Sequence, residues 1–433
     1  MRNALVRALS VLLGAVLLMA LALGGDARAA GEEGLAPPGT VITTKNWKQY
    51  KGVMEQGLQG LFSGDYFWKF PADFRIEIGP THNYPLPKLY QEYTEKYSKD
   101  VKIVDLPDGG HSIKGYVGGL AFAHPSGPLK GWEILVNTWF EYVPHITCAP
   151  NNHVFLRDRY GNLTTEVTTT VYRQFNFVSD PGVPNSDPDG KGLYYSEYTR
   201  VLAPEQSRYT TQLTLYYTDP TKSEDLFLFI PALRRTLRLS AASRCSPFVG
   251  TDWTQDDVKQ LFNGGIVRFD ATLVGEPKIL ALTVANESAV SNMNNYSIFF
   301  PGPNIGKWEV RDSYLLDVRR IPSQRSGYCF GKRMLYVDQQ QWTQFWADLY
   351  DGNMKYWKST SFQQIAHQVP GVGPVMYTGE YLVSLWDQQN SHASAWIANP
   401  PYGTNQQCAN LGGINYTDAK LYSSVGGLSS IMQ

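Results

Sequence analysis

The sequence lacks an excess of charge of either sign. Its 38 Lys and Arg residues almost balance its 39 Asp and Glu residues, and the formal net charge is -1. Nucleic-acid binding takes much of its free energy from basic residues that neutralise phosphates, so we expect no nucleic-acid partner. Charged residues are also few, at 18% against 43% apolar residues. This composition excludes a mainly disordered chain and supplies the apolar side chains of a large core.

Common catalytic and metal-binding motifs are absent as well. The sequence contains neither G-x-S-x-G nor H-E-x-x-H, and no glycine-rich phosphate loop follows a predicted strand. Its 7 His residues are scattered, and no two cysteines have C-x-x-C spacing. We therefore expect no metal site and no cofactor. One acidic pair, Asp348 and Asp351, flanks a predicted turn, where a structural role is the simpler interpretation.

A long apolar run occurs only at the N-terminus. Arg2 and Arg7 precede the apolar residues 11–23, and the small-residue site Ala27-Arg28-Ala29 follows them. The run is shorter than the ~20 residues that a membrane-spanning helix needs, and its flanks are typical of a secretory signal peptide. We expect residues 1–29 to be removed after export.

Cysteines are few but even in number. Residues 30–433 are expected to form a single soluble domain with a C-terminal extension from about residue 388. The 4 cysteines are Cys148, Cys245, Cys329 and Cys408. An even number in an exported chain predicts two disulfides, and all three possible pairings stay open. Because the signal is short and of bacterial type, the expected location is the periplasm, either free or associated with the outer membrane.

Aromatic residues are plentiful, at 13%, and the hydrophobic period is mostly two. In residues 163–177, Leu163, Val167 and Val171 alternate with polar residues, which predicts an amphipathic antiparallel strand. The same pattern or a β-branched run predicts further strands in residues 193–202, 209–217, 226–239, 267–273, 279–284, 308–318, 333–337, 344–350, 354–358 and 375–386. Asp351-Gly352 resembles a two-residue hairpin turn.

Helices are predicted at three places. Thr44 can cap a helix whose apolar residues run from Trp47 to Leu61 at spacings of three and four, and a second helix opens at Pro87. A third, residues 252–262, begins with a capping-box-like pair and turns Val258, Leu261 and Phe262 inwards. The run 132–137 is ambiguous, and its β-branched content favours a strand.

The order of these elements predicts a mainly β (α+β) fold. Strands in series with short connections indicate one large antiparallel sheet rather than alternating βα units. A twisted sheet of this size has to curl, so we expect an incomplete barrel whose apolar face is covered by helices or a ligand.

One segment suggests a binding site. The apolar strand from Leu226 breaks at Pro231, and Arg234 and Arg235 follow. A proline at this place implies an edge, a bulge or a bend. We predict that Phe229 and Leu233 line a ligand cavity and that Arg234 and Arg235 lie at its rim, where they would hold an anionic head group. The alternative is a surface cluster of salt bridges.

Several segments together resemble an exported bacterial family, domain of unknown function 1329, whose members are often labelled outer-membrane lipoprotein-sorting-like. The matching segments are Val41–Trp47, Gly115–Phe122, Ile230–Arg235, Gly250–Asp252 and Leu335–Asp351. Ala121 and Ala123 stand where the family usually has proline, which affects only that turn. The resemblance implies a lipoprotein-carrier-like fold and no enzymatic activity. It also implies partnership with an inner-membrane exporter and an outer-membrane protein.

The leading hypothesis is a non-enzymatic carrier of a lipid or another hydrophobic small molecule, without bond-making. Two alternatives stay open. One is an envelope enzyme that acts on lipids or glycans through Asp348 and Asp351, and the other is a ligand-free scaffold subunit of an exporter or outer-membrane complex.

Overall fold

The computed structural model describes residues 35–240, 244–248, 250–259, 261–376 and 382–432. The predicted signal peptide lies outside these ranges. Within them, no helix is both long enough and apolar enough to cross a membrane.

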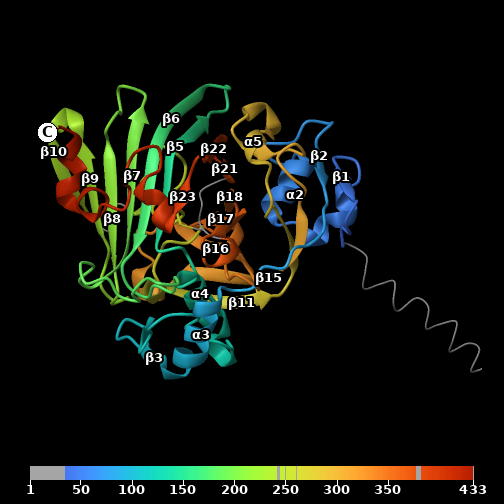
Figure 1. The fold of residues 1–433 in the computed structure, drawn as a ribbon. Helices are drawn as coiled ribbons and strands as arrows, with labels where there is room; N and C mark the ends of the chain where they lie inside the picture. The colour runs from blue at the N-terminus through green and yellow to red at the C-terminus, as the bar shows by residue number, and fades with distance from the viewer. Residues whose placement is uncertain (1–34, 241–243, 249, 260, 377–381, 433) are drawn as a thin grey trace, which may run out of the picture.

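A 15-stranded sheet dominates the structure (Figure 1). Its strands are β5 (Ile146–Arg157), β6 (Leu163–Gln174), β7 (Leu193–Ala203), β8 (Thr211–Tyr217), β9 (Asp225–Ile230), β10 (Arg235–Leu239), β11 (Phe269–Gly275), β12 (Lys278–Ala281), β15 (Glu309–Arg320), β16 (Phe330–Asp338), β17 (Gln344–Asp351), β18 (Tyr356–Gln363), β21 (Leu382–Asp387), β22 (His392–Ile397) and β23 (Gly403–Thr404). Neighbours pair antiparallel in the order β10-β9-β8-β7-β6-β5-β22-β21-β18-β17-β16-β15-β11, with β12 on β15 and β23 on β5.

The sheet is strongly twisted and not closed. In Figure 1, β7, β8 and β9 stand roughly upright, with neighbours pointing in opposite directions, whereas β11 and β15 lie across the page. The two ends of the strand path, β10 and β11, do not pair with each other. The predicted mainly β fold with one large, open antiparallel sheet is therefore confirmed.

An N-terminal layer packs on the outer face of the β15–β22 half. It contains β1 (Val41–Thr43), β2 (Arg75–Glu77), the 3₁₀ helix η1 (Trp47–Val53) and α2 (Gln56–Ser63). The stacked rings of Phe300, Trp308 and Trp346 lie in the same cluster. The predicted single helix from Thr44 to Leu61 is wrong in one respect. Met54 is extended and Glu55 caps α2, so the helix is in two pieces.

A C-terminal layer covers the outer face of the other half. Residues 405–432 include η9 (Asn405–Ala409), α6 (Ala419–Tyr422) and η10 (Val425–Met432). Tyr416, Tyr422 and Leu428 pack there against side chains of β5–β9. The preceding strand β22 lies in the sheet itself, between β5 and β21. The chain beyond residue 388 is thus part of the sheet and of its outer layer.

The inner face of the sheet, opposite these two layers, receives α4 (Lys130–Trp139), with α3 (Lys88–Tyr97) and the hairpin β3 (Lys102–Asp105) and β4 (His111–Lys114) beside it. The predicted helix at Pro87 is confirmed. The predicted strand over residues 132–137 is wrong, because these residues belong to α4. Side chains on nearly every side of α4 are buried, so its apolar run has no clear helical period. In the absence of that period, the β-branched residues favoured the wrong prediction of a strand.

The connection from β10 to β11 crosses the inner face from one edge of the sheet to the other. We name its described residues, 244–248, 250–259 and 261–265, the crossover segment. The helix predicted over residues 252–262 is wrong: the described residues of this range form no helix and mostly turns, and Lys259 and Leu261 have φ angles of 51° and 66°. Left-handed residues break a right-handed helix. Leu261 and Phe262 are nevertheless buried, as predicted.

Candidate functional site

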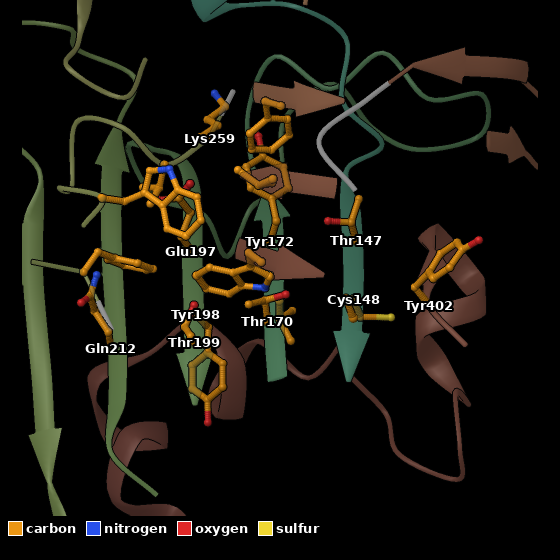
Figure 2. Close-up of a pocket in the computed structure, with 18 of the residues that line it drawn as sticks. Thr147, Cys148, Thr170, Tyr172, Glu197, Tyr198, Thr199, Gln212, Lys259 and Tyr402 are labelled. Atoms are coloured by element: carbon orange, nitrogen blue, oxygen red, sulfur yellow. The ribbon is translucent and has the colours of Figure 1, made fainter. Parts of the chain in front are cut away.

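A pocket lies between the crossover segment and the inner face of the sheet (Figure 2). One wall is apolar and comprises Phe362, Val383 and Trp396 from β18, β21 and β22. The other wall is largely polar and comes from β5 to β8, with Thr147, Thr170, Tyr172, Glu197, Thr199 and Gln212. The enclosed volume is about 70 Å³. Waters need ≳10–15 Å³ of such volume, whereas ligand pockets measure roughly 300–1,000 Å³. The pocket as it stands is therefore too small for an acyl chain.

The two walls differ because strand alternation exposes different residues on one face. Thr170 and Tyr172 of β6 pair across from Thr199 and Thr147, so they share the inner face with these polar neighbours. Trp396 of β22 pairs with Val383 of β21, which in turn pairs with Phe362 of β18. Residues two apart in a strand share a face. The curled sheet thus places a polar wall and an apolar wall around one space.

The crossover segment fills most of that space. The rings of Phe248 and Trp396 stack at 5.8 Å. Trp253, 2% exposed, donates its ring N–H to Thr360 Oγ1 at 3.3 Å. Ser394 Oγ donates to Asp252 Oδ2 at 3.0 Å. On the opposite wall, Gln212 Nε2 donates to Gln255 Oε1 at 2.9 Å. The segment therefore bridges the two walls.

Buried ion pairs hold the crossover segment in place. Arg244 pairs with Asp256 and, at 2.5 Å, with Glu224, while Arg333 of β16 pairs with Asp257. Burial alone would raise the pKa of Glu224, but Arg244 and Arg268 lower it to about 2. Such pairs give little net stability compared with apolar packing, yet losing one partner is strongly destabilising. They fix where the segment lies more than they hold the fold together.

Disulfides settle the cysteine pairing that the sequence left open. Cys148 is bonded to Cys408 and Cys245 to Cys329. The second bond ties the start of the crossover segment to the residue before β16. The first ties β5 to the C-terminal layer.

Besides Asp257, which is paired with Arg333, the pocket is lined by Glu197 of β7 and Lys259 of the crossover segment (Figure 2). Burial raises the pKa of Glu197 to about 7, against the opposing influence of Lys259. Burial lowers the pKa of Lys259 to about 8, although Glu141 and Glu197 favour its charged form. Burial therefore disfavours the charged form of both groups.

The residues predicted to bind a ligand lie elsewhere. Phe229 is 2% exposed, on the outer face, in the cluster with Tyr416 and Leu428. Leu233 is 54% exposed in the 3₁₀ turn η4 (Pro231–Leu233) between β9 and β10. Arg234, with a φ of 49°, and Arg235 are exposed just after it. None of the four is among the residues that line the pocket, and their part in ligand binding stays a prediction.

The acidic pair of the enzyme alternative does not converge on the pocket. Asp348 is buried on the outer face and accepts backbone N–H groups of Gln56 and Gly57, both at 3.1 Å. Asp351 accepts those of Asn353 and Lys355, at 2.9 and 3.0 Å, in a four-residue turn rather than the predicted two-residue turn. Asp348 thus joins the start of α2 to the sheet, and Asp351 stabilises its own turn.

A second cleft, of about 420 Å³, lies between the β3–β4 hairpin and residues 218–221. Its apolar lining includes Val104, Ile113, Tyr116, Phe140 and Phe177. Among the described residues, no group of three or more His, Cys, Asp or Glu side chains is placed to hold a metal ion.

The family is shown by its sequence model. The model described as "Protein of unknown function (DUF1329)" matches residues 41–412. The chain belongs to the DUF1329 family. One relative of this DUF1329 protein is the uncharacterized protein PA3922 of Pseudomonas aeruginosa, which is 23% identical over 328 residues, or 73% of this chain and 67% of the relative.

Solved structures with partial likeness include a DUF1329 family protein from Desulfovibrio piger, 15% identical, with a TM-score of 0.45 over 66% of this chain and 99% of that chain. A domain from Vibrio parahaemolyticus that is named for outer membrane lipoprotein sorting is 13% identical, with a TM-score of 0.45 over 64% and 92%. A LolA superfamily protein from Nitrosomonas europaea is 13% identical, with a TM-score of 0.34 over 62% and 90%. The site geometry, rather than these partial likenesses, carries the functional proposal.

Proposed function

We propose that this DUF1329 protein is a non-enzymatic protein of the bacterial envelope that holds a lipid or another hydrophobic molecule on the inner face of its sheet. The observation that carries this proposal is the way in which the inner face is filled. The apolar residues of β18, β21 and β22 are covered by the crossover segment, whose described residues form mostly turns and bends, and which buried charges and one disulfide keep in position.

A ligand would take the place of side chains from the crossover segment. Phe248 and Trp253 occupy the space next to Trp396 and Phe362. Each CH₂ group removed from water contributes about 0.8 kcal/mol, so a chain of a dozen carbons could compete with two aromatic rings for this surface. The Cys245–Cys329 bond would keep one end of the segment attached while the rest moves.

The chemistry of the site supports binding rather than catalysis. The Asp348 and Asp351 carboxylates are engaged with backbone N–H groups away from the pocket. The two disulfides suit an oxidising compartment, which supports the periplasm as the location. An exporter and an outer-membrane protein as partners remain part of the proposal through the family resemblance.

The test is native mass spectrometry of the protein purified from the periplasm, followed by solvent extraction of what it carries. A reproducible apolar adduct, released by solvent and absent after delipidation, is the expected result. Variant Trp396→Ala should retain less of it, whereas Trp308→Ala, which alters the outer-face cluster, should retain as much per folded molecule. A protein that is always empty but co-purifies with a stoichiometric partner would instead support the scaffold alternative.

A further inference from the structure

The ammonium group of Lys259 lies in an aromatic cage. Its Nζ is 4.9 Å from the ring centroid of Trp139, 5.4 Å from that of Tyr194 and 4.1 Å from that of Tyr195. It also lies 3.5 Å from the backbone carbonyl oxygen of Trp139. A cation within about 6 Å of a ring centroid is attracted by the negative face of the ring, and several rings together make the kind of site that proteins use for ammonium ligands.

Two carboxylates complete the cage. Glu141, which follows α4, and Glu197 of β7 both favour the charged form of Lys259. Most of the groups involved are deeply buried, since Trp139 is 8% exposed, Glu141 4% and Lys259 6%, whereas Glu197 is partly buried. A buried site with three aromatic rings and two acids is electrostatically complementary to a cation.

The cage and its occupant belong to different parts of the structure. Tyr194, Tyr195 and Glu197 lie on β7, and Trp139 ends α4, so the cage is built on a strand and a helix. Lys259 lies in the crossover segment, where its φ of 51° is unusual for a residue with a side chain. A movement of the part of the crossover segment around Lys259 would withdraw the ammonium group from rings that β7 and α4 hold. Asn263, later in the same segment, is hydrogen-bonded to Tyr195 and Glu197.

The cage adjoins the pocket with the apolar wall through Lys259 and Glu197, whereas its three rings lie behind the lining of that pocket. Lys259 and Glu197 both line that pocket, together with Phe362, Val383 and Trp396 (Figure 2). A molecule with its head group in the cage would therefore have apolar surface next to it for a hydrocarbon tail. The polar wall and the apolar wall match the two ends of an amphiphile.

We propose that Lys259 is an internal substitute for the head group of the ligand, and that the protein binds an amphiphile with a cationic amine head and an apolar tail. This inference rests on the proposed function, because it names the ligand class of the same pocket. It assigns the head group to the cage of Trp139, Tyr194 and Tyr195, and the tail to the surface that Phe248 and Trp253 cover.

The first experiment fills the cage with a small probe. In Lys259→Ala, thermal unfolding is followed with and without n-butylammonium, using n-butanol and butyrate as neutral and anionic probes of similar size. The variant should have a lower Tm than the native protein, and butylammonium should restore more than half of that loss, while the other two probes restore none. Equal effects of all three probes, or no effect of butylammonium, would overturn the assignment of the cage.

A matched control is Lys222→Ala. The Lys222 Nζ lies 3.4 Å from the ring centroid of Tyr217, a contact with a single ring outside the pocket. Butylammonium should not change the Tm of this variant. An increase as large as that of Lys259→Ala would show a general salt effect and would count against the cage.

The second experiment tests the tail and does not require Lys259→Ala to fold. Decyltrimethylammonium, decanoate and decanol are titrated below their micellar concentrations into the native protein and into Lys259→Met, which keeps the packing of the side-chain stem. Trp fluorescence is expected to show at least tenfold tighter binding of the cationic probe than of the other two, and tighter binding by Lys259→Met than by the native protein. Equal binding of the three probes would overturn the cationic head group but leave the carrier proposal intact.

The two proposals fail in different ways. If butylammonium rescues Lys259→Ala but no decyl probe binds, the cage is a site for a small amine, and both the tail and the carrier function are wrong. If decyltrimethylammonium binds no more tightly than butylammonium, the tail contributes nothing and the amphiphile is excluded.

Discussion

At the scale of single residues, the tightest constraint on the N-terminal layer is Gly57, at the first turn of α2. A Cβ atom there would lie 2.0 Å from Ser359 Oγ and 2.7 Å from the hydroxyl oxygen of Tyr356. The helix thus approaches β18 so closely that only glycine fits. The same contact brings the backbone N–H of Gly57 within reach of Asp348.

Gly57→Ala should therefore separate α2 from the sheet and lower the free energy of unfolding by about 1–3 kcal/mol, as overpacked sites do. Urea unfolding monitored by tryptophan fluorescence measures the change. Gly275→Ala is the matched control, because a Cβ at Gly275 meets no atom within 4 Å. If both variants unfold at the same urea concentration, α2 is not packed as described.

A second residue-scale prediction concerns pH. Burial raises the pKa of Asp348 from its ordinary value of 3.8 to about 6, and burial together with Asp348 raises the pKa of Glu55. The folded state then binds more protons than the unfolded state, so this part of the stability is complete below pH 3.8 and is lost as the pH rises through about 6.

Asp348→Asn should remove this loss, so the free energy of unfolding should fall less between pH 4 and pH 7 than in the native protein. Urea titrations at several pH values give the slope of the unfolding free energy against pH for the variant and for the native protein. Asp351→Asn provides the contrast, since hydrogen bonds from Gln389 and the turn backbone lower the pKa of that exposed carboxyl. Its slope between pH 5 and pH 7 should equal the native one, and a native slope in Asp348→Asn would contradict the prediction.

At the scale of elements, the crossover segment is the part whose position depends most on buried charge. Asp257 accepts hydrogen bonds from Thr254 and pairs with Arg333, which is 1% exposed. Removing one charge leaves the other buried without its partner. The segment should then leave the inner face more often than in the native protein.

For Asp257→Asn we expect a loss of about 3–5 kcal/mol in the free energy of unfolding, as for other broken buried pairs. We also expect faster hydrogen exchange confined to the crossover segment and greater uptake of an apolar fluorescent probe. Arg238→Gln is the control, because the Arg238 side chain is 68% exposed in its ion pair with Asp225 and the pair should be worth about 0–1 kcal/mol. Slow exchange in Asp257→Asn would show that apolar contacts alone hold the segment.

The sequence predicts some elements well and others poorly, for physical reasons. Strands with one solvent-exposed and one buried face, such as β6 and β15, keep a clear hydrophobic period of two residues, and the sequence predicts them. Strand β5 was missed because it contains a bulge: its register shifts between Ala149 and Asn152, and Asn151 has a φ of 57°. The bulge interrupts the alternation on which the prediction depends.

The candidate site was harder to predict than the sheet. Trp253 and Lys259 lie in a connection where the sequence pattern predicted a helix, whereas the left-handed conformation of Lys259 and Leu261 gives the chain another course. Their places depend on partners far away in the sequence, such as Thr360 for Trp253 and Tyr195 for Lys259. The apolar and basic segment from Phe229 to Arg235 resembles a binding site in its local sequence, but local sequence does not show which face of a curled sheet is enclosed.

At the scale of the whole molecule, the two disulfides fasten different layers. Cys148–Cys408 closes a sequence separation of 260 residues and holds the C-terminal layer against β5, whereas Cys245–Cys329 closes 84 residues beside the crossover segment. Longer loops lose more chain entropy when they are closed. The outer bond should therefore contribute more to global stability, and the inner bond to the position of the crossover segment.

The double variant Cys148→Ser with Cys408→Ser should lower the free energy of unfolding by about 2–5 kcal/mol, and by more than Cys245→Ser with Cys329→Ser. Denaturation in the absence of reductant measures both. Only the second pair of changes should increase uptake of an apolar probe by the folded protein. The opposite order of stabilities would show that the C-terminal layer does not depend on its covalent bond.

The position of β22 also constrains how the molecule forms. This strand comes near the end of the chain, yet it is the link through which β5 meets β21. A polypeptide that emerges from its N-terminus can build each wall from neighbouring hairpins, but it cannot join the walls until the final residues arrive. Such distant pairing is slow, so the pairing of β22 with β5 and β21 should form last in folding. It should also be the first part of the sheet to separate when C-terminal residues are removed.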